Sequence, residues 1–239
     1  MQYDNPAARL LSILSDGKKV AANDPCKRSW ATLLETPEGD GALLVSRIGK
    51  LMGLPQEIIE RTQELYPNQR QTWHHWSHQV NTAFSTQNLN AQWNTFIQHI
   101  DDHTINYLAN AAELLEARST IKQLDAASVK ELRDKVNNLL SRVVDSDFDA
   151  QLKKYIIHHL RQILVAIDEY KITGALPILD AVESTIGHAY LDESYRNSLQ
   201  GTEIGKEILT TLAAVANLVT IAVGLPPLAH AVLQLTGHG

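Results

Sequence analysis

The last 32 residues of the chain, 208–239, contain no Asp, Glu, Lys or Arg, although 20% of all residues are charged. A helix built from such a segment has no strongly polar face, so most of its surface must be removed from water. That surface can be buried in the protein's own core, in a partner or in a lipid bilayer. The segment therefore constrains both the fold and the function.

A helix over residues 202–224 would present one broad apolar face and one face of small, weakly polar side chains. The apolar face comprises Ile204, Ile208, Leu212, Val215, Leu218, Val219 and Ala222, and the second face comprises Lys206, Thr210, Ala213, Asn217, Thr220 and Gly224. Small residues let another helix approach closely, and the Asn217 amide can form a hydrogen bond across that contact. We therefore expect this helix to be surrounded on most sides.

The stretch 208–223 is a poor match for a conventional transmembrane anchor. Its 16 residues span about 24 Å as a helix, whereas the hydrocarbon core of a bilayer is about 30 Å thick. Its threonines and asparagine weaken insertion, and no basic residue follows its C-terminal end. The sequence favours a central buried helix covered by a short final helix over 228–235. Burial in an oligomer, or conditional insertion of residues 208–223 into a membrane, is the alternative.

Helical periodicity runs through nearly all of the remaining chain, and no alternating strand pattern persists. With 44% hydrophobic residues and only 12 Gly and 8 Pro among 239 residues, the chain has the composition of a globular protein with a sizeable core. We predict an all-α fold, a multi-helix bundle with a buried hydrophobic C-terminal helix. Its expected parts are a short-helix N-terminal subdomain (1–68), an antiparallel bundle of long helices (69–200) and the hydrophobic helical segment (201–239).

Proline and glycine positions predict where the helices begin and end. Asn5-Pro6, Asp24-Pro25 and Leu54-Pro55 indicate helix starts, with Asn5 and Asp24 as caps. Gly17, Gly53 and Gly174 indicate helix ends. The predicted short helices cover 5–15, 25–35, 41–52 and 55–66. Longer helices follow, including one from Trp93 to about Arg118, one that begins at Asp149, and others over 176–190, 193–199 and 202–224.

The charge balance and the single cysteine narrow the function classes. A net charge of −6, a pI near 5.9 and the lack of a Lys/Arg cluster argue against a nucleic-acid partner. Cys26 is the only cysteine, which excludes an intramolecular disulfide and a thiolate metal cluster. The N-terminal residues lack the basic-then-apolar pattern of a secretion signal. We expect a cytoplasmic protein without a cofactor, which binds another protein or a second copy of itself.

Two pairs of histidines have metal-ligand spacing. His74 and His78, like His99 and His103, are four residues apart, which places two imidazoles on one face of a helix. At about 100° per residue, however, the first pair falls about +120° and the second about −100° from the apolar face of its helix. The pairs then lie on opposite flanks of a hairpin. We therefore expect surface histidines and no metal site.

Arg70 and His75 have the spacing Arg-x4-His, which resembles the motif of the all-α HEPN ribonucleases. That resemblance implies a histidine that transfers protons and an arginine that holds a phosphate, contributed by both subunits of a dimer. The chain departs from the family pattern at Gln71, where a different polar residue usually follows the arginine. A HEPN-like ribonuclease is therefore our alternative function.

A second catalytic candidate combines two carboxylates with a histidine on one predicted helix. Asp180, Glu183 and His188 lie in the stretch TGALPILDAVESTIGHAY. Paired carboxylates can act as general acid and base if burial raises one pKa. Because Asp180 and Glu183 have apolar neighbours in the sequence, a buried polar network is expected here, and with it an all-α hydrolase as a further form of the alternative.

Three segments resemble a group of bacterial helical proteins with no established activity. They are NPAARLL, TGALPILDAVESTIGHAY and TLAAVANLVTIAVGLP. Proteins of this kind tend to be encoded in mobile or accessory gene regions, which implies a role in defence. The function we expect is therefore a non-enzymatic helical interaction or effector protein, with a sequestered apolar helix that acts at membranes when it is released.

Overall fold

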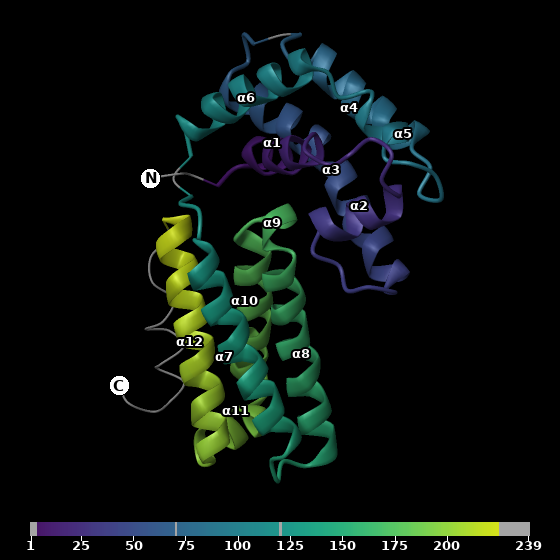
Figure 1. Cartoon of the computed structure of the whole chain (residues 1–239). Helices are drawn as coiled ribbons and strands as arrows, with labels where there is room; N and C mark the ends of the chain where they lie inside the picture. The colour runs from purple at the N-terminus through teal and green to yellow at the C-terminus, as the bar shows by residue number, and fades with distance from the viewer. Residues whose placement is uncertain (1–3, 70, 120, 225–239) are drawn as a thin grey trace. The chain divides into compact units, whose positions relative to one another are not determined.

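The computed structural model describes residues 4–69, 71–119 and 121–224. Within these ranges the chain forms twelve helices and no strand, which confirms the all-α prediction (Figure 1). The helices are α1 (Pro6–Gly17), α2 (Cys26–Leu33), α3 (Gly41–Leu65), α4 (His74–Thr86), α5 (Asn94–Ile97), α6 (Asp102–Glu116), α7 (Ala126–Val144), α8 (Ala150–Asp168), α9 (Tyr170–Thr173), α10 (Leu176–Leu191), α11 (Glu193–Gly201) and α12 (Glu203–Val223).

The chain forms two compact units, each with its own hydrophobic core. In the described ranges, the N-terminal unit comprises residues up to 119 together with 171–173, and the C-terminal unit comprises 121–170 and 174–224. These units do not follow the expected boundaries at 68 and 200. The reason is packing, because α4 and α6 pack with α3, and α12 packs with α7, α10 and α11.

An aromatic cluster forms the centre of the N-terminal unit. The ring of Trp30 meets Trp93 edge-on with centroids 4.9 Å apart, and Phe96 at 4.7 Å. The Nε1 atom of Trp30 donates to Gln87, and that of Trp93 donates to the carbonyl of Gly17. Both indoles thus bury their rings while their polar atoms are hydrogen-bonded.

Three predicted helix boundaries in the N-terminal unit are wrong. α3 continues through Gly53 and Pro55 instead of breaking there, because the buried positions on both sides of Pro55 stay in helical register. The predicted helix from Trp93 to Arg118 is interrupted, since Asp101 accepts a hydrogen bond from the Thr104 N–H and starts α6 anew. Asp24 does not cap α2, whose N-cap position is taken by Pro25.

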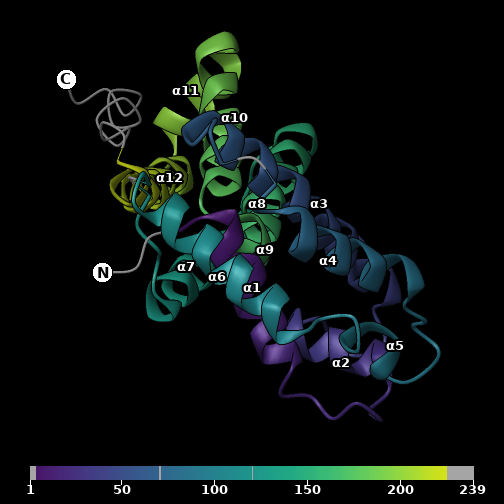
Figure 2. The ribbon, with the colours of Figure 1, turned by 90° about the horizontal axis from the view of Figure 1, so that it is seen from above.

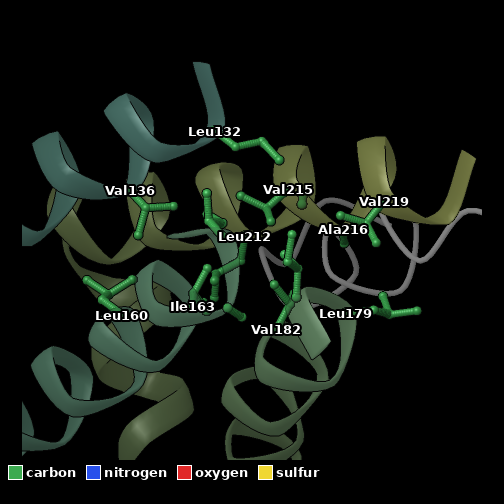
Figure 3. Close-up of a cluster of buried hydrophobic side chains, with 14 of the residues drawn as sticks. Leu132, Val136, Leu160, Ile163, Leu179, Val182, Leu212, Val215, Ala216 and Val219 are labelled. Atoms are coloured by element: carbon green, nitrogen blue, oxygen red, sulfur yellow. The ribbon is translucent and has the colours of Figure 1, made fainter. Parts of the chain in front are cut away.

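Four helices, α7, α8, α10 and α12, run beside one another in the C-terminal unit (Figure 1). α7 contacts α8 and α12, and α10 contacts α8, α11 and α12. Ten of the buried side chains that fill the space between them point toward one another in Figure 3: Leu132 and Val136 of α7, Leu160 and Ile163 of α8, Leu179 and Val182 of α10, and Leu212, Val215, Ala216 and Val219 of α12.

The helix boundaries predicted for the C-terminal unit agree closely with the structure. The Asp149 carboxylate accepts from the N–H groups of Gln151 and Leu152 and starts α8, as predicted. Gly174 ends α9 with a φ of 77°, in the left-handed region that favours glycine. The helix predicted over 228–235 lies outside the described residues.

Candidate functional site

Helix α12 is held at both ends by hydrogen bonds, and at its start also by an ion pair. At its start, the Thr202 hydroxyl accepts from the Gly205 N–H, and Glu207 forms an ion pair with Arg142 of α7. At its end, Gly224 adopts a φ of 74°, and the Ala222 carbonyl accepts from the Lys122 N–H at 2.6 Å. The uncharged stretch 208–223 therefore lies between two anchored ends.

Most of the uncharged stretch of α12 is enclosed by its own unit. The buried residues of this stretch are Ile208, Leu209, Leu212, Ala213, Val215, Ala216, Val219, Thr220, Ala222 and Val223. Figure 2 shows this helix nearly end-on. Thr210 is exposed, and Ile221 keeps 58% of its surface in solvent. The predicted burial is thus confirmed for one side of the helix, and a strip on the other side faces solvent.

Among the described residues, one helix, α12, is long and apolar enough to cross a membrane. Of its most apolar 18-residue segment, 56% is buried in the protein. The predicted hydrogen bond of Asn217 across a helix contact is not present within the described ranges; its side chain is half-buried. Thr220, by contrast, is buried, and its hydroxyl donates a hydrogen bond to the Ala216 carbonyl at 2.8 Å. Its polar atom is therefore satisfied inside the core.

A cluster of aromatic and histidine side chains joins α8, α10 and α11. The Tyr155 ring lies 4.3 Å from the His159 ring, 4.3 Å from the His188 ring and 5.3 Å from the Tyr195 ring, measured between centroids. The Nε2 atom of His188 lies 3.6 Å from the Asp192 carboxylate. We call these five residues the Tyr–His cluster.

The Tyr–His cluster borders a cavity of about 300 Å³ that is also lined by Asp149, Gln151, Leu152 and Ser198. The Tyr195 hydroxyl and the Nδ1 atom of His159 are buried without a hydrogen-bond partner among the described residues. Neither atom is accessible from the cavity, because both have almost no solvent-accessible surface.

A larger hollow of about 670 Å³ lies in the N-terminal unit. It is lined mainly by exposed residues, among them the basic Arg28 and the acidic Glu38.

Burial perturbs the titration of this cluster. It raises the pKa of the Tyr195 hydroxyl, and the nearby Tyr155 raises it further. Burial also raises the pKa of Tyr155, with a smaller contribution from Asp192. For His159, burial lowers the pKa, and the neighbouring His158 and His188 lower it further. A hydrogen bond with Gln162 acts in the opposite direction and has a smaller effect. Burial therefore disfavours the charged forms of Tyr155, His159 and Tyr195.

The predicted Asp180–Glu183–His188 network is not formed. Asp180 and Glu183 are solvent-exposed on α10, so the expectation of a buried polar network is wrong. His188 contacts Tyr155, Tyr195 and Asp192 instead. The apolar neighbours in the sequence pack on the opposite side of the helix, which leaves the carboxylates in water.

His74, His78 and His103 are exposed and His99 is half-buried, as expected for surface histidines, but one of the two pairs does not have the predicted helical geometry. His99 follows α5 and His103 belongs to α6, so the two do not share a helix face. His99 contacts the Thr86 hydroxyl at 3.0 Å. Within the described ranges, no group of three His, Cys, Asp or Glu side chains is placed to hold a metal ion. His74 and His78 lie in these ranges and belong to no such group.

His75 has a carboxylate partner that the sequence did not indicate. Its Nε2 atom lies 3.0 Å from Asp101, and its ring meets His103 edge-on. Although burial acts to raise it, hydrogen bonds from Thr104 and His75 lower the pKa of Asp101 to about 2. The pair is partly exposed on the surface of the unit. Arg70 lies outside the described residues, so the Arg-x4-His motif stays a prediction.

Comparison with family models, with curated proteins and with solved structures found no match.

The features that the sequence reasoning missed are the Tyr155, His159 and Tyr195 members of the Tyr–His cluster. Tyr155 and His159 are four residues apart on one predicted helix, so both side chains can lie on the same helix face. That spacing is the signal that could have found these two, whereas Tyr195 lies on another helix, α11, and joins them by packing. Chemically, His159 resists protonation, and the enclosed side of α12 offers an apolar surface that only opening of the bundle would expose.

Proposed function

We propose that this protein is a helical effector that acts at membranes by releasing α12 from the C-terminal unit. In the resting state the uncharged stretch 208–223 packs on α7, α10 and α11. In the active state it enters a lipid bilayer, alone or with a second copy or a protein partner. The resemblance to bacterial proteins of accessory gene regions makes defence the biological setting of this proposal.

The observation that carries the proposal is the contrast between the two ends of α12. All of its charged side chains, Glu203, Lys206 and Glu207, lie in the first two turns, and none follows as far as Gly224. The 16 uncharged residues 208–223 span about 24 Å, most of the roughly 30 Å of a hydrocarbon core. The solvent-facing positions of this stretch, such as Thr210 and Ile221, carry no charge, whereas a partly exposed helix normally carries charges on its wet side.

Dye release from anionic lipid vesicles tests the proposal with a substitution that spares the fold. Ile221 is 58% exposed, so Ile221→Asp leaves the packing of the bundle intact. In a bilayer the same carboxylate costs about 2.5–3.5 kcal/mol at mid-depth and less near the end of the helix. Because Ile221 lies near the end of α12, we expect the substitution to reduce dye release severalfold at equal protein concentration.

Val165→Asp is the matched control, because Val165 is 49% exposed, has the same kind of side chain and lies on α8 of the same unit. It should release dye as the unmodified protein does. Equal dye release by the Ile221→Asp and Val165→Asp variants, or no release by the unmodified protein between pH 7.5 and pH 4.5, would rule out membrane insertion of α12.

A further inference from the structure

We infer that His159 is an acid-sensitive latch on the C-terminal unit: its protonation opens the contact between α8 and α10 and thereby uncovers α12. This inference rests on the proposed function, because it supplies the signal that releases the helix. It concerns a residue and a role that the sequence pattern alone did not suggest.

The geometry around His159 leaves no place for a positive charge. The side chain is 8% exposed, and its ring packs on Tyr155 at 4.3 Å and on His158 at 5.4 Å between centroids. Its Nδ1 atom is buried without a partner among the described residues. A protonated imidazole carries an N–H at both nitrogens, so the proton on Nδ1 would be a buried donor without an acceptor.

The groups that face His159 make the charge still less favourable. On α8 itself these groups are Tyr155, the exposed His158 and Gln162, which hydrogen-bonds the His159 ring. From α10 the facing group is His188, a second imidazole whose charge would repel that of His159. A carboxylate within ion-pair distance of His159 is absent from the described part of the chain.

The remaining charged groups nearby are engaged elsewhere. Asp192, between α10 and α11, lies 3.6 Å from the Nε2 atom of His188 and forms no ion pair with His159. On α7, which also packs on α8, Arg133 pairs with Asp168 and Arg142 pairs with Glu207. A positive charge on His159 would therefore have no counter-ion among the described residues.

The direction of the pH effect follows from these contacts. Burial, with the charges of His158 and His188, lowers the pKa of His159 below its ordinary value of 6.5. Above that value both the folded and the unfolded chain carry a neutral imidazole. As the pH falls below it, the unfolded chain binds the proton and the folded chain resists it, so acid favours the open state.

The latch acts on α12 through shared packing. Leu160, the residue after His159, lies in the same core as Val182 of α10 and Leu212 of α12 (Figure 3). α10 contacts both α8 and α12. Separation of α8 from α10 therefore removes one of the walls that cover the uncharged stretch 208–223.

A pH titration of the full chain from 7.5 to 4.5 tests the latch by two readouts: binding of an apolar dye that reports opening, and dye release from anionic vesicles. His159→Gln and His159→Phe remove the titrating ring, and His158→Gln is the matched control on an exposed neighbouring position. The unmodified protein should open below about pH 6.5. Both His159 variants should shift the midpoint down by at least about half a pH unit, whereas His158→Gln, which removes only one of the contributions that lower the pKa of His159, should shift it by less.

The outcomes separate the latch from the membrane proposal. A wild-type midpoint in both His159 variants overturns the latch and leaves membrane action standing if vesicles still leak. A shifted opening midpoint without any vesicle leakage supports the latch and overturns membrane action. If both variants fail to fold at pH 7.5, NMR titration of the imidazoles in the unmodified protein decides: a His159 ring that titrates at about 6.5 overturns the latch.

Discussion

The Tyr195 hydroxyl is the polar atom in the C-terminal unit whose removal we expect to be favourable. It is buried without a hydrogen-bond partner among the described residues, and a buried unpaired hydroxyl costs about 1–3 kcal/mol. Tyr195→Phe should therefore raise the free energy of unfolding by about 1 kcal/mol, measured by urea unfolding followed by far-ultraviolet circular dichroism.

Tyr170→Phe provides the matched comparison in the same unit. The Tyr170 hydroxyl accepts from the buried Leu124 N–H at 2.7 Å, so its removal leaves a donor unpaired. That variant should lose about 1–3 kcal/mol. An equal loss in Tyr195→Phe would show that the Tyr195 hydroxyl has a hydrogen-bond partner after all.

Burial of single polar residues was the least predictable property from the sequence. Asp180 and His159 both stand in apolar segments, yet Asp180 is exposed and His159 is buried. The local sequence indicates which residues share a helix face, whereas the neighbouring helices decide how far around the helix the covered surface extends. The partner of His75, Asp101, is 26 positions away along the chain and is set by tertiary packing.

At the scale of helices, the junction between α11 and α12 contains two glycines with opposite surroundings. A Cβ atom on Gly205 would lie 2.6 Å from the Cα atom of Leu199 and still closer to its carbonyl oxygen, and that backbone cannot turn away like a flexible side chain. At Gly201 a Cβ atom would meet nothing within 4 Å.

Gly205→Ala should therefore force α11 away from α12, with a loss of about 2 kcal/mol or more in the free energy of unfolding. Gly201→Ala should be neutral or should gain up to about 1 kcal/mol from helix propensity. Urea unfolding measures both, and binding of an apolar dye at pH 7.5 should increase only in the Gly205→Ala variant. Similar stability of the two variants would contradict this account of the junction.

Helix ends were predicted well where one local contact decides them. Asn5, Asp149 and Thr202 each accept a hydrogen bond from a backbone N–H within the first helical turn, a contact that depends only on nearby residues. Pro55 was misread because its missing N–H removes one bond from a 25-residue helix, and burial of Leu54 and Ile58 compensates. α6 begins at Asp101 inside a continuous apolar pattern, which periodicity does not reveal.

At the scale of the whole chain, the sequence predicted the helical class and the buried C-terminal helix but not the two units. Periodicity identifies each helix, whereas membership of a unit depends on contacts between helices that are far apart along the chain. α1 and α6 pack together in one unit, and α10 and α12 in the other. All four tryptophans lie in the N-terminal unit. Tryptophan fluorescence therefore monitors that unit separately from the release of α12.

The position of α12 relative to a bilayer is the most direct test of its release. A polarity-sensitive fluorophore on Ile221→Cys reports the uncharged stretch, and the same fluorophore on Val165→Cys reports α8. Cys26 is fully buried and does not compete for the label in the folded protein. The measurement is quenching by lipids that carry a quencher deep in the acyl chains, at pH 7.5 and pH 5.

We expect the fluorophore at position 221 to be quenched at pH 5 and unquenched at pH 7.5, and the fluorophore at position 165 to be unquenched at both. Quenching at position 221 that matches the value at position 165 at both pH values would contradict the central claim that α12 leaves the bundle for the membrane.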